Sequence, residues 1–132
     1  MTPESINQQL ARVPFFRFLD FKITEIDDES AVAILPFADR LIGNPVMDIY
    51  HGGIIASFME AVAAVGVSSV PTSPAKPVNV TVDYLRPAFR GPLMARATIS
   101  RKGKRLASVR TVSWQEDESR LVAEGLYHFL MV

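Results

Sequence analysis

Hydrophobic and polar residues recur with a helical period in the middle of this chain. An apolar stripe between residues 52 and 67 contains Ile55, Phe58, Met59 and Val62, since residues three and four apart share one face of a helix. The opposite face carries small residues and one carboxylate: Gly53, Ala56, Ser57, Glu60 and Ala64. The pattern predicts a helix that is buried on one side. Its other face carries Glu60 among small residues, so another part of the protein or a second chain can approach it closely.

Segments on both sides of this helix alternate between apolar and polar residues, as half-buried antiparallel strands do. We expect two strands before the helix, at 21–27 and 31–36, and four after it, near 78–86, 92–102, 105–115 and 120–131. Residues 37–50 are expected to form a loop. The proline-rich run 71–77 is expected to be a connector, because proline cannot donate to a strand ladder. A short first helix, capped by Ser5 or Thr2, is expected to extend to about Arg12.

These elements predict an α+β fold in which a curved antiparallel sheet wraps one long helix, within a single domain covering residues 1–132. A chain of this length buries about two-thirds of its unfolded surface, which is enough for one core. An open sheet leaves edge strands that proteins usually hide. Edge pairing between two copies about a two-fold axis would hide one edge and bring the two helices together. We therefore expect a homodimer.

Composition narrows the classes of function. The 14 basic and 14 acidic residues cancel, so the chain has no broad field to hold nucleic acid or an anionic membrane. It has no cysteine and only two histidines, His51 and His128, which disfavours disulfides, a cysteine nucleophile and a metal centre. Neither a signal peptide nor an uninterrupted apolar span is evident. We expect a cytoplasmic protein with no metal or other cofactor and no nucleic-acid or membrane partner.

The segment His51-Gly52-Gly53 stands at the expected start of the long helix, and Glu60 follows seven residues after Gly53. Glycines at that position leave backbone N–H groups bare at the positive end of the helix, where an oxyanion is stabilised. Seven residues span about 10 Å, whereas an oxyanion donor and a base must each lie about 3 Å from one carbonyl. Two antiparallel copies satisfy this, with Gly53 of one chain facing Glu60 of the other. The alternative is a structural glutamate that is hydrogen-bonded to a strand or reaches solvent.

The same residues resemble a known family. His51-Gly52-Gly53 with an acid at Glu60, followed by Val80-Thr-Val-Asp-Tyr-Leu-Arg-Pro-Ala88, is similar to the hotdog-fold acyl-CoA thioesterases of the PaaI type. The resemblance covers nearly the whole chain. It implies the hotdog fold, an acyl-CoA substrate, and dimers that pair into a tetramer. By position it implies the Gly53 N–H as oxyanion donor, Glu60 as nucleophile or general base, and His51 as the residue that shapes the helix start and the thioester pocket.

The resemblance also implies residues that bind the substrate or coenzyme A: Gly52, Asn79, Tyr84, Arg86 and Arg90. The two arginines suit the phosphates of coenzyme A. Asn44 resembles the family asparagine that orients water or substrate, although a turn-forming Asn-Pro is an equal alternative.

Two positions depart from the family pattern. Pro77 stands where some members have a serine or threonine, and Thr72 and Ser73 lie nearby in the connector. Glu60 replaces the aspartate of many relatives, and its longer side chain could attack directly or act through water.

The predicted activity is the hydrolysis of an acyl-CoA thioester to a free acid and coenzyme A. Two alternatives stay open. A hydratase or dehydratase of the same fold would use His51, and a non-catalytic acyl-CoA binder would keep the pocket without turnover. The acyl group itself is not specified by the sequence, since one methylene is worth only about 1–3 kcal/mol in selectivity.

Overall fold

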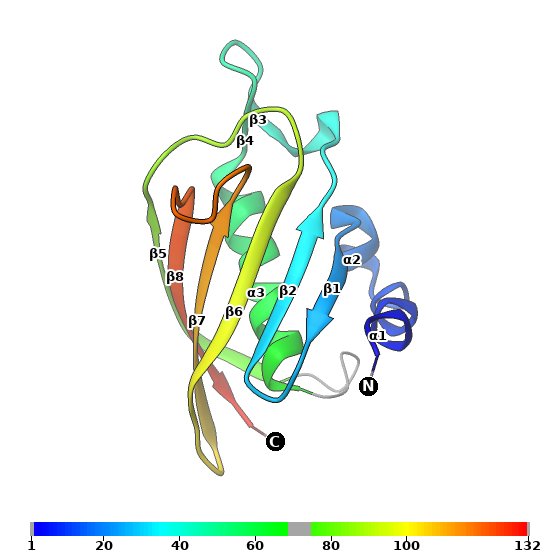
Figure 1. Ribbon diagram of the computed structural model, residues 1–132, viewed down its shortest axis with the longest axis vertical. Helices are drawn as coiled ribbons and strands as arrows, with labels where there is room; N and C mark the ends of the chain where they lie inside the picture. Colours follow the sequence, from blue (N-terminus) through cyan, green and yellow to red (C-terminus); the bar gives the residue numbers. More distant parts are fainter. Residues whose placement is uncertain (1, 69–74, 132) are drawn as a thin grey trace.

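The computed structural model describes residues 2–68 and 75–131 (Figure 1). Its helices are α1 (Pro3–Leu10), α2 (Pro14–Leu19), the 3-10 helix η1 (Asp39–Leu41) and α3 (Gly52–Val67). Its strands are β1 (Lys22–Ile26), β2 (Ser30–Leu35), β3 (Ile42–Asn44), β4 (Ile49–Tyr50), β5 (Lys76–Tyr84), β6 (Leu93–Lys102), β7 (Leu106–Trp114) and β8 (Ala123–Leu130). Within these ranges, six strands form one sheet in the order β1-β2-β6-β7-β8-β5, and β3 pairs with β4.

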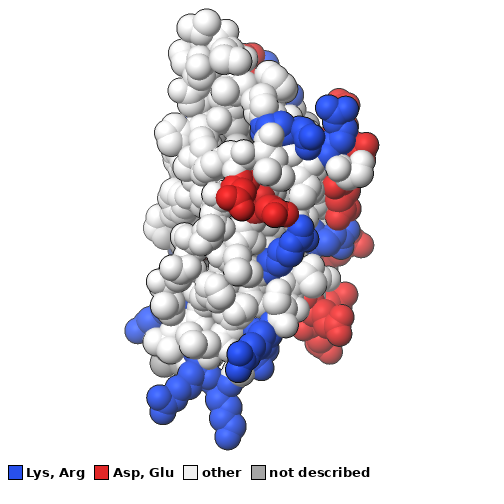
Figure 2. All heavy atoms as spheres, turned by 90° about the vertical axis from the view of Figure 1, so that its left-hand side faces the viewer, with Lys and Arg blue, Asp and Glu red and all other residues white. Residues whose placement is uncertain are grey.

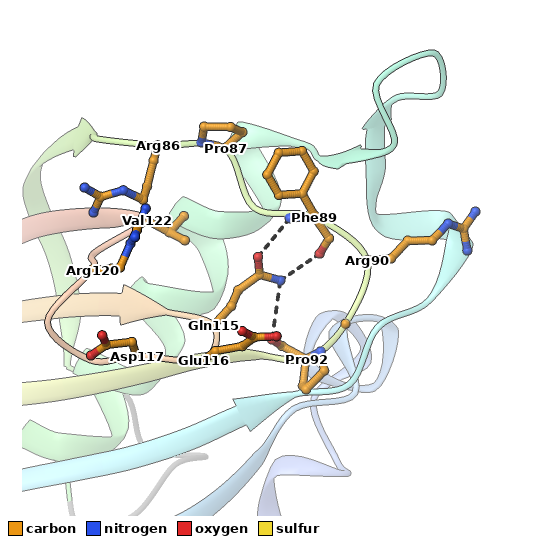
Figure 3. A pocket seen from close by; sticks show the side chains of 11 residues that line it. Arg86, Pro87, Phe89, Arg90, Pro92, Gln115, Glu116, Asp117, Arg120 and Val122 are labelled. Carbon is orange, nitrogen blue, oxygen red and sulfur yellow. Dashed lines mark hydrogen bonds between the residues drawn. The ribbon is translucent and has the colours of Figure 1, made fainter.

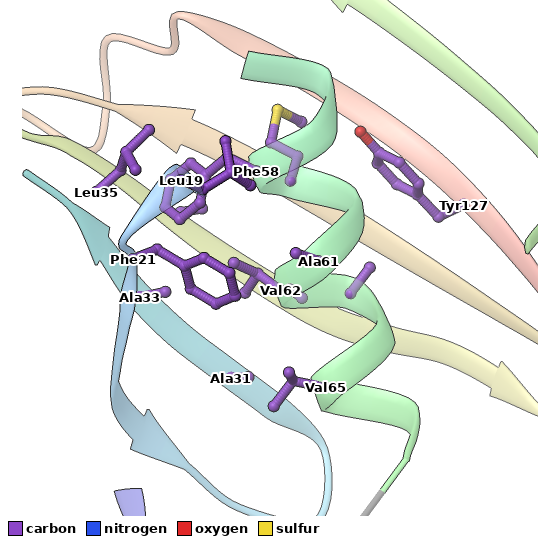
Figure 4. Packing of buried hydrophobic residues seen from close by; sticks show 14 of the residues in the cluster. Leu19, Phe21, Ala31, Ala33, Leu35, Phe58, Ala61, Val62, Val65 and Tyr127 are labelled. Atoms are coloured by element: carbon purple, nitrogen blue, oxygen red, sulfur yellow. The ribbon is translucent and has the colours of Figure 1, made fainter. Parts of the chain in front are cut away.

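Every pair of neighbours in the large sheet is antiparallel, and α3 packs across one face of it (Figure 1). The apolar stripe of α3 faces the sheet, where Phe58 and Val62 are fully buried (Figure 4). Phe21 lies against Phe58, with ring centroids 5.7 Å apart. Burial of each such side chain contributes roughly 1.5–3 kcal/mol. The predicted layout of one long helix packed on an antiparallel sheet is therefore confirmed.

Small residues let the helix lie close to the sheet. Ala31 pairs with Ala97 across β2 and β6, and Ala33 pairs with Ala95, and all four are buried. Gly66 of α3 faces this row, so a Cβ built there would lie 3.8 Å from Ala97 and 3.9 Å from Ala31. Larger side chains in this row would push the helix off the sheet, because cores are packed at near-crystalline density.

The predicted bounds of α3 agree with the structure, and two other expectations are wrong. Residues 37–50 are not a plain loop, because they contain η1 and the β3–β4 hairpin. Pro77 belongs to β5, next to a register irregularity between Pro77 and Asn79. A proline is tolerated there because β5 pairs with only one strand, β8, within the protomer and Pro77 lies near its start. Thr72 and Ser73 lie outside the described residues.

The two outer strands of the sheet have different surroundings. Thr2 and Ser5 form a capping box on α1, whose Ile6 and Leu10 are buried. Asn7 of the same helix donates to the Ile23 carbonyl at 3.0 Å and accepts from the Ile23 N–H at 2.8 Å. This side chain therefore occupies the free edge of β1.

The opposite edge, β5, is exposed along most of its length. Val78 and Val80 keep 61% and 45% of their surface accessible. Figure 2 views the molecule from the β5 side and shows a broad area without Lys, Arg, Asp or Glu along one side, whereas charged residues lie near the middle of the view, along the other side and at the lower end. No helix in the described ranges is long and apolar enough to cross a membrane.

Candidate active site

The start of α3 is capped by the side chain of His51. Its Nδ1 accepts a hydrogen bond of 2.8 Å from the Gly53 N–H. The His51 carbonyl accepts from the N–H groups of Ile54 and Ile55 at 3.0 and 3.2 Å. A neutral imidazole that accepts at Nδ1 carries its proton on Nε2. His51 thus shapes the helix start, as expected from the sequence.

This cap corrects the expectation that the Gly53 N–H is bare. That N–H is already satisfied by His51, since a side-chain acceptor at the N-cap takes one of the orphan donors of the first turn. The Gly52 N–H has no hydrogen-bond partner among the residues that the structure describes. Gly52 therefore provides the available donor at the positive end of α3.

Tyr84, at the end of β5, holds Gly52 in place. Its phenol donates a 2.7 Å hydrogen bond to the Gly52 carbonyl. A Cβ added at Gly52 would lie 3.3 Å from the Tyr84 ring, so the ring must move by a few tenths of an ångström to accept any side chain here. The two residues predicted at the substrate site, Gly52 and Tyr84, are thus brought together.

Glu60 lies two turns along α3 from Gly52 and is half-buried. Its carboxylate forms no hydrogen bond or ion pair within the described part of the protomer. Burial raises the pKa of this carboxyl above its ordinary value, because desolvation disfavours the charged form. The alternative of a structural glutamate paired with a strand therefore has no support in the protomer.

The side chain of Tyr127, on β8, contacts α3 close to Glu60. It is buried, and its phenol donates a 3.0 Å hydrogen bond to the Ala56 carbonyl, one turn before Glu60. Burial raises the pKa of Tyr127, and the charge of Glu60 raises it further. The sequence pattern did not identify Tyr127, since a buried tyrosine in a strand has the same local pattern as any core aromatic.

Asn44 has the turn-forming role. Its Oδ1 accepts from the N–H groups of Val46 and Met47 at 3.0 and 3.1 Å, which is the geometry of an Asx turn. This turn closes the β3–β4 hairpin, whose tip exposes Val46. In the protomer Asn44 therefore fixes a loop.

Asn79 is not brought to the helix face. It pairs with His128 across β5 and β8, and the neighbours of His128 along β8, Tyr127 and Phe129, are buried against the core. Side chains alternate between the faces of a strand, so Asn79 and His128 lie on the face away from α3. His128 Nδ1 is there 2.9 Å from the Ser108 hydroxyl.

Arg90 is held by carboxylates of its own chain. It forms ion pairs with Asp48 and, at 3.3 Å, with Asp39, and its guanidinium lies 4.9 Å from the centre of the Phe37 ring. Asp48 raises the pKa of Arg90 through its hydrogen bond. Arg90 therefore fixes the β3–β4 hairpin in the protomer, and its binding of a coenzyme A phosphate stays a prediction.

Arg86 lines a cavity of about 420 Å³ between the segment after β5 and the turn before β8 (Figure 3). One of its guanidinium nitrogens donates to the Leu121 carbonyl at 2.7 Å. Arg120 lines the same cavity and was not identified in the sequence, because only the register of the sheet brings its turn to Arg86. Across the described ranges, no group of three or more His, Asp or Glu side chains could hold a metal ion.

Comparison with known proteins gives the family of the chain. A model of the thioesterase superfamily matches residues 47–122. A medium/long-chain acyl-CoA thioesterase of Salmonella typhimurium, YigI, is 30% identical over 123 residues, which cover 80% of this chain and 78% of that protein.

Solved structures share the fold. An X-ray structure of a thioesterase superfamily protein superposes with a TM-score of 0.88 at 29% identity, covering 98% of both chains. The phenylacetic acid degradation protein PaaI of Thermus thermophilus has the same fold, with a TM-score of 0.78 at 23% identity over 91% of this chain and 100% of that one. The long helix packed on a six-stranded antiparallel sheet is thus the hotdog fold, and the chain belongs to the thioesterase superfamily.

Proposed function

We propose that this protein hydrolyses acyl-CoA thioesters with an active site shared between two subunits. The observation that carries the proposal is the half-buried Glu60 carboxylate without a partner in the described residues, on the helix whose first residue, Gly52, has an N–H that is likewise unpartnered there. Eight residues separate these groups, or about 12 Å along the helix, which is too far for both to act on one carbonyl. Gly52 of one subunit and Glu60 of the other meet this requirement in an antiparallel pair.

The exposed edge of the sheet supports a homodimer as the working unit. β5 presents unpaired backbone groups together with Val78 and Val80, which is a surface that proteins rarely leave in water. Pairing of two β5 strands about a two-fold axis would join the sheets and bring the small-residue faces of two α3 helices together.

A second apolar area supports pairing of dimers into a tetramer. Leu106, Leu126 and Leu130 are exposed on β7 and β8, and Leu106 pairs with Leu130 across the two strands. They lie on the sheet face away from α3. Burial of this face against a second dimer would remove their apolar surface from water.

In the proposed reaction, the Gly52 N–H donates to the thioester carbonyl oxygen and stabilises the oxyanion as it forms. Glu60 of the facing subunit either removes a proton from the attacking water or attacks the carbonyl itself, which would give an anhydride that water then cleaves. The carbon–sulfur bond breaks and coenzyme A leaves as a thiolate. A thiolate needs no strong general acid, since the pKa of a thiol is about 8.5.

The geometry of His51 favours hydrolysis over a hydratase or dehydratase. A hydratase would need an imidazole nitrogen free to accept a proton, whereas His51 Nδ1 already accepts from the Gly53 N–H. Using it as a base would remove the cap of α3. A non-catalytic acyl-CoA binder is the remaining alternative, and turnover distinguishes it.

The first experiment measures thiol release from short, medium, long and aryl acyl-CoAs, with wild type and Glu60→Gln side by side. Because the Salmonella relative is named a medium/long-chain acyl-CoA thioesterase, medium and long acyl chains are the main substrates to test. We expect Glu60→Gln to lose at least about 100-fold in kcat while it keeps its fold and assembly. Binding without turnover in wild type would instead identify an acyl-CoA binder.

A second experiment tests the oxyanion donor. Gly52 is the first residue of α3, and His51 has φ −66° and ψ 133°, a conformation that a following proline accepts. Gly52→Pro therefore deletes the N–H and keeps the helix start. Gly52→Ala is the matched control, because it also adds a Cβ beside Tyr84 but keeps the N–H.

We expect Gly52→Pro to lose about 100-fold or more in kcat relative to Gly52→Ala. Mixing the Gly52→Pro and Glu60→Gln proteins then tests whether each site is shared between two subunits. In a mixed dimer, one site would combine the intact Gly52 of one chain with the intact Glu60 of the other. Recovery of activity after subunit exchange supports a site made by two chains. Failure of exchanged dimers to regain activity would place both groups of one site in the same chain.

A further inference from the structure

Two tyrosines from neighbouring strands bind successive turns of α3. The Tyr84 hydroxyl donates to the Gly52 carbonyl at 2.7 Å, and the Tyr127 hydroxyl donates to the Ala56 carbonyl at 3.0 Å. Gly52, Ala56 and Glu60 are four residues apart, so they form one row along the helix. The two hydroxyls therefore contact the first two members of a row whose third member carries the proposed catalytic carboxylate.

The carbonyl that Tyr127 contacts is linked to the backbone of Glu60. In an α-helix each carbonyl accepts from the N–H four residues later, and Glu60 follows Ala56 by four residues within α3. Helical side chains also lean toward the N-terminus of their helix, so the Glu60 carboxylate extends toward the turn that contains Ala56. Tyr127 is thus bound to the turn over which this carboxylate lies.

The Tyr127 ring reaches this turn because β8 has no side chain beside it. Residues 125 and 127 lie on the same face of β8, and a Cβ built at Gly125 would lie 2.6 Å from Cε2 of the ring. Real atoms do not approach so closely, so the ring occupies the space that a side chain at Gly125 would need. Figure 4 shows the ring beside α3 with its hydroxyl turned toward the helix. The ring is almost completely buried, which leaves it little freedom to move.

Tyr84 and Tyr127 are the ionisable groups of β5 and β8 on the helix side of the sheet. Burial raises the pKa of Tyr127, and the charges of Glu60 and of Tyr84 raise it further, so the three groups share one electrostatic environment. The remaining ionisable residues of these two strands lie on the opposite face of the sheet: Lys76, Asp83, Glu124 and His128.

In the described ranges, the other elements around α3 bring no charge to this turn. The buried positions of β2, β6 and β7 carry only alanine, valine, leucine, threonine, serine and tryptophan. Arg17 of α2 donates to the Ala11 carbonyl at 3.0 Å. The ionisable residues at the two ends of α3 lie more than one turn from Glu60: His51 at its start, and Lys102, Asp27 and Asp28 beside its last turn. Tyr127 therefore acts on Glu60 without a competing charge at this turn of the described protomer.

We propose that Tyr127 is a positioning residue for Glu60. Its hydroxyl fixes the turn of α3 beneath the carboxylate and stabilises the charged form of that carboxylate. The inference rests on the proposed function, in which charged Glu60 acts as base or nucleophile, and it adds the residue that controls this group. A hydroxyl rotates about its C–O bond, so Tyr127 can turn its donor from the Ala56 carbonyl toward Glu60 when the carboxylate loses its proton. A donor to the charged form lowers the pKa of a carboxyl, which here offsets part of the effect of burial.

The first test measures the pKa of Glu60 directly, by carbon NMR of isotope-labelled protein in which Glu60→Gln identifies the signal. We expect Tyr127→Phe to raise this pKa by about half a unit to one unit, since it removes one donor to a charged group. Tyr50→Phe is the matched control, because it also removes a buried tyrosine hydroxyl, which donates to the Gly91 carbonyl at 2.6 Å. This control should leave the pKa of Glu60 unchanged.

An unchanged pKa of Glu60 in Tyr127→Phe, or an equal rise in Tyr127→Phe and Tyr50→Phe, would overturn the proposal. The measurement needs no turnover. A rise that is confined to Tyr127→Phe would therefore support the role of Tyr127 even if the protein hydrolysed no acyl-CoA.

The second test uses the pH dependence of hydrolysis. The activity of a base or nucleophile is lost as the pH falls through its pKa, so the acidic limb of kcat should move to higher pH in Tyr127→Phe. At a pH well above the pKa of Glu60, kcat should still fall about two- to tenfold with KM unchanged, because Glu60 is held less firmly. Tyr84→Phe acts on Gly52 and should leave the acidic limb in place. An acidic limb that does not move in Tyr127→Phe, or that moves equally in both variants, would overturn the assignment.

Discussion

The two edge strands of the sheet, β1 and β5, differ in whether their unpaired backbone groups are covered by the chain itself. At β1 the chain covers its own edge, because the Asn7 side chain takes both the N–H and the carbonyl of Ile23. At β5 the described chain leaves the edge bare, with Val78 and Val80 exposed. An exposed apolar edge strand is costly to a protein that remains a monomer.

The proposed active site lies beside the bare edge. Tyr84 ends β5 and contacts Gly52, and Tyr127 of the neighbouring strand supports the helix near Glu60. The covered edge carries no residue of the candidate site. In the proposed dimer, the N-terminal segment stabilises the fold, whereas the β5 side binds the second subunit that completes the site.

The largest effect is expected from a charge on the bare edge. Val80→Lys would place an ammonium in the proposed interface, where burial of an unpaired charge is strongly unfavourable. We expect a folded monomer whose hydrolytic activity falls at least about 100-fold, since each site would lose its partner groups. Sedimentation analysis and thiol release measure the two effects.

The same charge on the covered edge is the control. Thr24 is exposed on β1, and we expect Thr24→Lys to leave assembly and activity unchanged. A Val80→Lys protein that remains dimeric and active would show that β5 is not the interface. Equal effects of both substitutions would remove the distinction between the two edges.

The next effect is expected from opening the covered edge. Asn7→Ala removes two hydrogen bonds from a half-buried position and leaves the Ile23 backbone groups unsatisfied. We expect the free energy of unfolding to fall by about 1–3 kcal/mol, as measured by urea denaturation. Because the site lies elsewhere, kcat should not change. A loss of activity without a loss of stability would contradict this division of roles.

A smaller effect is expected where the bare edge meets the helix start. Tyr84→Phe deletes the hydrogen bond to the Gly52 carbonyl, so the Gly52 N–H is held less firmly. We expect kcat/KM to fall about two- to tenfold, which corresponds to about 0.5–1.5 kcal/mol for one hydrogen bond. Since Tyr84 is half-exposed, the melting temperature should change little. A large drop in melting temperature would instead assign Tyr84 a structural role.

The smallest effect concerns the stability contribution of Glu60. Its pKa is raised by burial, so the folded state favours the protonated form, and the charged form destabilises the fold at neutral pH. We expect Glu60→Gln to be more stable than wild type at pH 7 by up to about 1 kcal/mol, given its partial exposure. The difference should shrink as the pH falls to the ordinary glutamate pKa of 4.5.

The stability difference also reports on assembly. A second subunit over α3 would desolvate Glu60 further, so the gain from Glu60→Gln should be larger in the wild-type background than in the Val80→Lys background. Thermal unfolding of the four proteins at several pH values measures this coupling. Equal gains in both backgrounds would indicate that no subunit covers Glu60.

Much of the fold was predictable because its signals are local. The apolar stripe and the glycines located α3 at residues 52–67, and alternation located the main strands to within a few residues. The β3–β4 hairpin was missed because its strands are too short to show a period. Pro77 was excluded from β5 because the edge position that tolerates a proline is a property of the whole sheet.

The sequence by itself therefore determined the long helix, the approachable face that carries Glu60, and the family to which the chain belongs, because these depend on spacing within one segment. Only the tertiary structure decided which groups are free to act. It assigned the Gly53 N–H to His51, paired Arg90 with Asp48, and placed Arg86 and Arg120 in the lining of one cavity. Such pairings join segments through a side-chain conformation or through the register of the sheet, and neither is encoded in a local pattern.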